Sequence, residues 1–77
     1  MDAIIEFPNG QRATLSEDGW QCSDEIINRS LTLLFGLDRV TGYDPNPIAN
    51  QADKAAQALG AKLIQAPETE WQDGVVY

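Results

Sequence analysis

The sequence has 77 residues, which is enough for one small domain spanning residues 1–77. Its twelve acidic and five basic residues, with no histidine, give a formal net charge of −7. This balance argues against direct binding to nucleic acid or to an anionic membrane, because both ligands attract a basic surface. The acidity has two explanations: it keeps the protein soluble, or it forms a face that competes for a basic groove on a partner, as nucleic-acid mimics do.

The hydrophobic fraction of 43% is typical of a globular protein and argues against a disordered chain. A single cysteine, Cys22, excludes an internal disulfide. No stretch approaches the roughly 18 consecutive apolar residues of a membrane helix, and the Met-Asp start lacks the basic region of a signal peptide. We therefore expect a cytoplasmic protein with no membrane partner. A homodimer stays open, because so short a chain gains buried surface by pairing.

Residues 3–7 and 11–15 predict a β-hairpin closed by a turn at residues 8–10. A two-residue loop would place Phe7 opposite Arg12 and Ile5 opposite Thr14, which mixes apolar and polar side chains on one face of this hairpin. A three-residue loop instead pairs apolar with apolar residues, Ala3 with Leu15 and Ile5 with Ala13. It also places Glu6 opposite Arg12, a favourable pair of opposite charges, and we predict this register.

Residues 16–19 predict a second turn, and Trp20 to Cys22 a short third strand that completes a meander. Trp20 follows a turn directly into this strand. We therefore expect its ring to fill the core between the sheet and the helix that comes next.

Residues 23–37 predict the central helix of the fold. Ser23 is the expected N-cap, and Asp24 and Glu25 place negative charge at the positive end of the helix dipole. Gly36 is expected to end the helix in the left-handed conformation. The residues expected to face the core recur at helical spacing: Ile27, Leu31 and Leu34, with Ile26 and Leu33 widening the face.

A second helix has two candidate starts, Asp44-Pro45 and Asn46-Pro47, because each pair joins a capping residue to a proline suited to the first helical position. The residue before a proline resists helical geometry, which favours Asn46 as the cap. Gly60 is expected to end this helix. The expected core-facing stripe is rich in alanine and allows close packing: Ile48, Ala52, Ala55, Ala56 and Leu59.

Residues 61–65 predict a fourth strand, residues 67–74 an acidic loop, and residues 75–77 a terminal strand. The predicted order is therefore β-β-β-α-α-β-β. Strands followed by helices favour an α+β fold, in which a small, mostly antiparallel sheet carries two helices packed on one face.

Candidate catalytic residues are few, because histidine, the commonest general base and metal ligand, is missing. Cys22 precedes the start of a helix, where a thiolate is stabilised, but the neighbouring Asp24 and Glu25 disfavour a thiolate. An ordinary buried cysteine is the preferred interpretation, and we predict no catalytic residue, cofactor or metal site. The weaker alternative is a divalent ion bound by the acidic loop, through Glu68, Glu70 and Asp73.

The candidate partner-binding residues are carboxylates and one tryptophan. The densest acidic group would share one end of the molecule if the turn at 16–19 folds beside the start of the central helix: Glu17, Asp18, Asp24 and Glu25. Helix capping and a solvated turn explain each of these residues without a shared function. The acidic loop adds Glu68, Glu70 and Asp73 around Trp71, which we expect to contact a partner because tryptophan is enriched in interfaces.

Three features carry a resemblance to known proteins: Asp44-Pro-Asn-Pro, the alanine-rich helix ending at Leu59-Gly60-Ala61, and the closing Gly74-Val-Val-Tyr77. This layout, opened by a hairpin, resembles small acidic proteins of uncharacterised families from bacteria and their tailed phages. The resemblance implies a bacterial or phage setting and a bacterial cytoplasm. It implies no activity and no functional residues.

These observations predict a non-catalytic protein-interaction module that binds a protein partner, or copies of itself, through an acidic face and exposed aromatic residues. One version is an inhibitor that occupies a basic, nucleic-acid-binding groove, and another is a small virion or assembly component. A hypothesis from a different class is an enzyme that uses Cys22 or a carboxylate cluster. Rapid alkylation of the Cys22 thiol at neutral pH would support that enzyme, and an inert thiol would argue against it.

Overall fold

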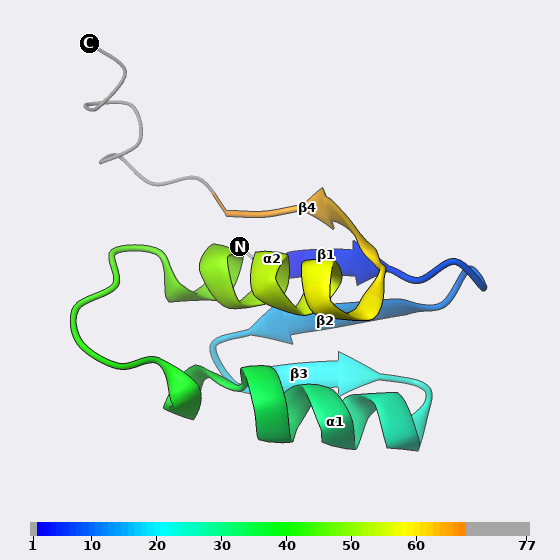
Figure 1. Cartoon of the computed structure of the whole chain (residues 1–77), viewed down its shortest axis with the longest axis horizontal. Coiled ribbons are helices and arrows are strands. Elements are labelled where there is room, and N and C mark those ends of the chain that lie inside the picture. The colour runs from blue at the N-terminus through cyan, green and yellow to red at the C-terminus, as the bar shows by residue number, and fades with distance from the viewer. Residues whose placement is uncertain (1, 68–77) are drawn as a thin grey trace, which may run out of the picture.

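The computed structural model describes residues 2–67, which form an antiparallel sheet with both helices on one face (Figure 1). The strands lie in the order β3-β2-β1-β4, and this arrangement confirms the predicted α+β fold. The predicted acidic loop from residue 68 and the terminal strand 75–77 lie outside the described residues. The elements are β1 (Ala3–Glu6), β2 (Arg12–Ser16), β3 (Gly19–Cys22), α1 (Glu25–Phe35), a 3₁₀ turn (Leu37–Arg39), α2 (Pro47–Leu59) and β4 (Lys62–Gln65).

The first hairpin has the predicted register. Its paired residues are Ala3 with Leu15, Ile5 with Ala13, and Glu6 with Arg12. The Phe7 N–H donates to the Gln11 carbonyl at 2.8 Å, which leaves a three-residue loop. Gly10 closes that loop with a φ of 90°, a conformation that side chains disfavour. The predicted charge pair is also present, with Arg12 Nε 3.0 Å from Glu6 Oε2.

The core lies between the sheet and the helices because strand residues alternate in direction. Trp20 is 5% exposed, which confirms its predicted place in the core. α2 contributes only alanines to the buried core, which allows the helix to approach the sheet closely. The fully or nearly buried apolar residues are Ala3, Ile5, Ala13, Leu15, Trp20, Leu31, Ala52, Ala55 and Ala56.

The start of α1 differs from the prediction, because Asp24 rather than Ser23 is the N-cap. The Asp24 carboxylate accepts hydrogen bonds from the backbone N–H groups of Ile26 at 2.9 Å and Ile27 at 3.1 Å. A carboxylate both satisfies these free donors and places negative charge at the positive end of the helix dipole, whereas a serine hydroxyl does only the first.

The apolar face of α1 is also narrower than predicted. Leu31 is fully buried, and Ile27 and Phe35 pack against the core on the same side. Leu34, which was expected on that side, is 62% exposed. α1 packs against β3, the outermost strand at one edge of the sheet, and so meets a narrow surface (Figure 1). Ile26 and Leu33, expected to widen the buried face, point away from it.

Gly36 ends α1 by a different route from the one predicted. Its φ of −66° and ψ of 161° are extended, not left-handed. Glycine is needed there because a β-carbon would lie 2.6 Å from the Thr32 carbonyl oxygen and 2.6 Å from Asp38 Oδ1. The chain turns so tightly out of the helix that only a residue without a side chain fits.

The second helix begins and ends as predicted, but Leu59, which was expected on its core-facing stripe, is 40% exposed. α2 has Asn46 as its N-cap and Pro47 at its first position, and it ends at Gly60 with a φ of 70°. The Asn46 side chain does not cap the helix; its amide donates to the Pro67 carbonyl at 3.0 Å. Asp44 orders the approach instead, because its carboxylate accepts from the Asn46 N–H at 2.9 Å and from the Asn50 amide at 2.8 Å.

Candidate functional site

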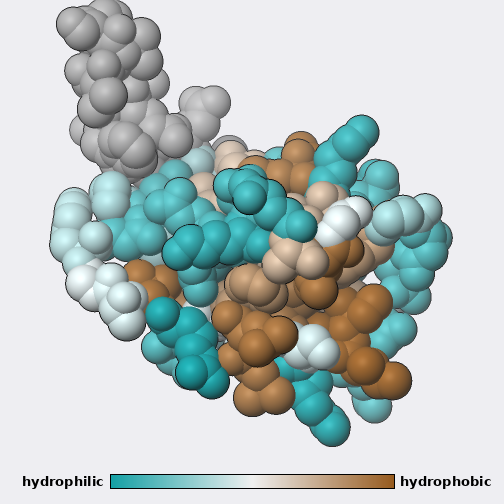
Figure 2. Space-filling model, in the orientation of Figure 1, coloured by the Kyte–Doolittle hydropathy of each residue, from teal (hydrophilic) through white to brown (hydrophobic). Residues whose placement is uncertain are grey.

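Three large aliphatic side chains on the outer side of α1 are in contact with solvent. Ile26 is 80% exposed, Leu34 62% and Leu33 55%. Figure 2 shows apolar side chains gathered over α1, in the lower half of the view, with hydrophilic side chains at their border. We call Ile26, Leu33 and Leu34 the α1 strip. Ser30, a small and half-buried residue, lies between them on the helix.

Leu33 also borders a hollow of about 400 Å³ that follows one side of α1. Glu25 lies at one end of this hollow and Thr32 at the other, with Arg29 between them. The hollow therefore joins the apolar strip to a carboxylate at the start of the helix. Such a surface offers an apolar contact together with a charged group that fixes orientation.

A second hollow, of about 260 Å³, lies at the far end of α1 and shares Thr32 with the first. Trp20 and Leu37 supply apolar surface within it, and three carboxylates supply charge. The acidic residues are Glu17 and Asp18 from the β2–β3 turn and Asp38 from the 3₁₀ turn. We call this group the acidic hollow. Its combination of apolar surface and carboxylates suits a lysine or arginine side chain, whose stem is apolar and whose head is cationic.

The predicted cluster of four carboxylates does not share one end of the molecule. Glu17 and Asp18 precede β3 and lie at the C-terminal end of α1, whereas Asp24 and Glu25 follow β3 and begin α1. Since an extended strand separates the two pairs, the acidic residues lie at opposite ends of the helix. Sequence reasoning missed Asp38 as the third member of the group at the C-terminal end, because its place depends on the turn after Gly36.

The other predicted partner-binding residues lie outside the described part of the chain. They are Glu68, Glu70, Trp71 and Asp73. Within residues 2–67, the most exposed aromatic side chain is Tyr43, at 92%, in the connection between α1 and α2. Its neighbours Gly42 and Pro45 are typical turn residues, a sign of exposure that the sequence does offer.

The end of α1 is held by side chains from three elements. Trp20 Nε1 donates to the Phe35 carbonyl at 2.9 Å, and the nearly buried Gln51 Nε2 donates to the Gly36 carbonyl at 3.0 Å. Arg39 Nε donates to the Leu33 carbonyl at 2.8 Å. The last carbonyls of a helix lack partners within the helix, so these donors satisfy them. They also fix the direction in which the α1 strip points.

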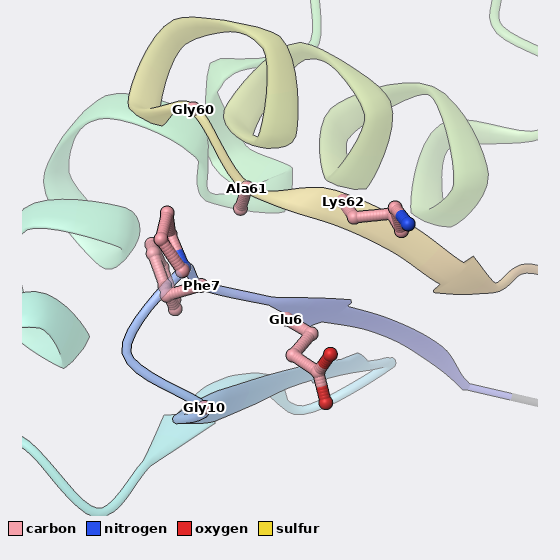
Figure 3. A pocket seen from close by; sticks show the side chains of 7 residues that line it. Glu6, Phe7, Gly10, Gly60, Ala61 and Lys62 are labelled. Atoms are coloured by element: carbon pink, nitrogen blue, oxygen red, sulfur yellow. The ribbon is translucent and has the colours of Figure 1, made fainter.

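A further hollow, of about 490 Å³, lies beside the turn of the first hairpin and the start of β4, around Phe7 (Figure 3). The Phe7 ring points toward Gly60 and Ala61, while the side chains of Glu6 and Lys62 point away from it (Figure 3). Glu6 is already paired with Arg12 at 3.0 Å. Polar groups therefore do not converge in this hollow, and convergence is what a small-molecule site requires.

Cys22 is a half-buried free thiol at the end of β3. Among residues 2–67, no group of three or more cysteine or carboxylate side chains is placed to hold a metal ion. In the same part of the chain, neither helix has the length and apolar character needed to cross a bilayer.

Comparison of the chain with protein-family models, with curated proteins and with solved structures finds no match.

Proposed function

We propose that this protein is a non-catalytic interaction module, of bacterial or phage origin, that binds a protein partner through the outer face of α1. The observation that carries the proposal is the exposure of the α1 strip, whose three side chains are 80%, 62% and 55% exposed. Exposed clusters of large aliphatic side chains on a small domain mark interaction surfaces, because leaving them in water is unfavourable.

The electrostatics of the same surface also favour a protein partner. Glu25 lies at one end of the α1 strip and the acidic hollow at the other, so an apolar centre is bordered by charge. Apolar centres with charged rims are the usual anatomy of protein interfaces. The predicted contact through Trp71 lies outside the described residues and stays a prediction, whereas the surface proposed here consists of aliphatic residues of α1.

The test is affinity capture from a nuclease-treated lysate of the cells that produce the protein. The bait is the whole chain, compared with an Ile26→Ser/Leu33→Ser variant and with an Ile64→Ser control. Ile64 is a matched control because it is 40% exposed but lies on β4, away from α1. We expect a stoichiometric protein that the wild type and the Ile64 variant retain and that the double variant loses.

Other outcomes would contradict the proposal or redirect it. If the double variant retained the partner as well as the wild type does, the outer face of α1 would not be part of the interface. Recovery of the bait alone as oligomers, at both low and high salt, would point to a structural role. A captured nucleic-acid-binding protein that is released when salt is raised from about 0.05 to 0.5 M would favour the inhibitor version, because salt screens charge contacts between exposed groups.

A further inference from the structure

From the two ends of the α1 surface, we infer that its partner is a basic amphipathic helix of another protein, with a lysine or arginine seated in the acidic hollow. This inference rests on the proposed function and specifies the chemistry of the partner.

The apolar match follows from helix geometry. Ile26 and Leu33 are seven residues apart, which is two helical turns or about 10.5 Å. A partner helix repeats its own apolar side chains at the same spacing, so it meets both residues along one side. The row Ile26-Ser30-Leu34 follows the i to i+4 ridge that packs into the groove of a neighbouring helix. Ser30, small and central, allows the two backbones to approach.

The charge at both ends defines the flanks of the partner helix. Arg29 and Arg39 are the cations of this surface, and Arg39 is already bonded to the Leu33 carbonyl. The carboxylates outnumber them and lie at the two ends of α1: Glu17, Asp18, Asp24, Glu25 and Asp38. A partner with basic residues in the turns on either side of its apolar centre therefore gains attraction at both ends.

The acidic hollow gives one of those basic residues a place. The hollow has a volume of about 260 Å³ and is lined by apolar surface from Trp20 and Leu37. Its carboxylates belong to Glu17, Asp18 and Asp38. The stem of a lysine or arginine would lie on the apolar surface with its cationic head among the carboxylates. Because Thr32 borders both hollows, this basic residue and the apolar contacts at Leu33 fit along one continuous path.

A second copy of the chain fits this surface poorly. Since both ends of α1 are acidic, two copies bring carboxylates against carboxylates whether their helices pair parallel or antiparallel. Like charges placed together oppose association. The overall charge of −7 on each chain acts in the same direction.

The test uses a fluorescein-labelled amphipathic peptide of leucine and lysine, about 18 residues long so that it can form a stable helix on binding. Two further peptides serve as probe controls: the same composition in scrambled order, and the same pattern with glutamate in place of lysine. Binding to the whole chain is followed by fluorescence anisotropy at low and high salt. We expect the patterned basic peptide to bind at least about tenfold more tightly than either control, because apolar spacing and charge both contribute.

Two pairs of variants separate these contributions. Ile26→Ser/Leu33→Ser should weaken the patterned basic peptide at least about tenfold, while Ile64→Ser leaves it unchanged. Glu17→Gln/Asp38→Asn should weaken binding and reduce its salt dependence more than Glu6→Gln/Asp53→Asn, which removes two charges on β1 and α2, away from the acidic hollow. Circular dichroism verifies the fold of each variant, and Leu34→Ser is a second strip variant should the double variant unfold.

Several results would overturn the inference. Equal binding of the scrambled peptide would show that the interaction depends on charge alone and not on the spacing of apolar residues. Equal effects of the two charge variants would show that the acidic hollow does not bind the peptide. A wild-type dimer that the strip substitutions dissociate would make a second copy the occupant. If a protein captured through α1 is not displaced by the patterned basic peptide, this inference fails while the proposed function stands. If neither capture nor peptide binding is seen, both fail.

Discussion

The indole N–H of Trp20 donates a hydrogen bond to the backbone carbonyl of Phe35 at 2.9 Å, and so joins the core of the sheet to the last turn of α1. Trp20 is 5% exposed, so its ring lies in the core, and the hydrogen bond that it donates is partly buried. This contact places the C-terminal end of α1 beside the β2–β3 turn. The α1 strip and the acidic hollow owe their relative positions to it.

Replacing Trp20 by phenylalanine removes the indole N–H, so the Phe35 carbonyl loses this hydrogen bond. We expect the free energy of unfolding to fall by about 1–3 kcal/mol, the range for leaving a buried acceptor unsatisfied. Urea unfolding should be followed by circular dichroism, because the substitution removes a fluorophore. Tyr43→Phe is the control: the Tyr43 side chain is 92% exposed, and its loss of a hydroxyl should change little. Equal stability of the two variants would contradict the structural role of the Trp20 bond.

The N-cap of α1 gives a direct comparison of neighbouring residues. Asp24→Ala should lower the free energy of unfolding by about 1 kcal/mol, because two backbone N–H groups lose their acceptor. Ser23→Ala should change it by less than about 0.5 kcal/mol, since Ser23 is exposed and lies outside the cap. Chemical denaturation of both variants measures these losses. A larger loss for Ser23→Ala than for Asp24→Ala would show that Ser23 is the N-cap.

At Gly36, alanine should destabilise the protein by about 1–3 kcal/mol, because the added β-carbon would lie 2.6 Å from two oxygen atoms. One of these atoms belongs to the flexible Asp38 side chain and the other to the Thr32 backbone. The Gly36→Ala/Asp38→Ala variant should therefore recover only part of the loss. A thermal or urea unfolding series measures both variants, and a harmless Gly36→Ala would show that the chain can leave the helix by another path.

The two sides of α1 should respond very differently to truncation. Leu31→Ala should cost about 2–5 kcal/mol, because Leu31 is fully buried and its loss leaves a cavity. Leu34→Ala should change stability by less than about 0.5 kcal/mol, because its side chain is 62% exposed. Similar losses for the two variants would mean that Leu34 packs in the core, as its spacing from Leu31 and Ile27 first indicates.

Local signals predicted most of the fold. The hairpin register followed from side-chain alternation and from the Pro8-Asn9-Gly10 turn, both of which are short-range. The start of α2 followed from the steric effect of Pro47 on its neighbour, which holds in any context. The terminal strand 75–77 lies outside the described residues and stays a prediction.

The candidate site was harder to predict, because it depends on what α1 packs against. Periodicity placed five aliphatic residues on the core side of α1, but one edge of a small sheet covers only part of a helix. Ile26 lies about 140° around the helix from Leu31, since successive residues turn by about 100°. This angle could have indicated from the sequence alone that Ile26 and Leu31 are not buried against the same surface. The acidic hollow carried no such sign, because it joins residues from two separate turns.

The most direct test of the central claim is an NMR titration of the ¹⁵N-labelled whole chain with the patterned lysine–leucine peptide. We expect amide shifts concentrated along α1, at Ile26, Leu33 and Leu34, and around Asp38 at the acidic hollow. The amides of Thr14 on β2 and Leu63 on β4, away from α1, should hold their positions. Shifts centred on those strands, or no shifts at saturating peptide, would contradict the claim that the outer face of α1 binds a basic helix.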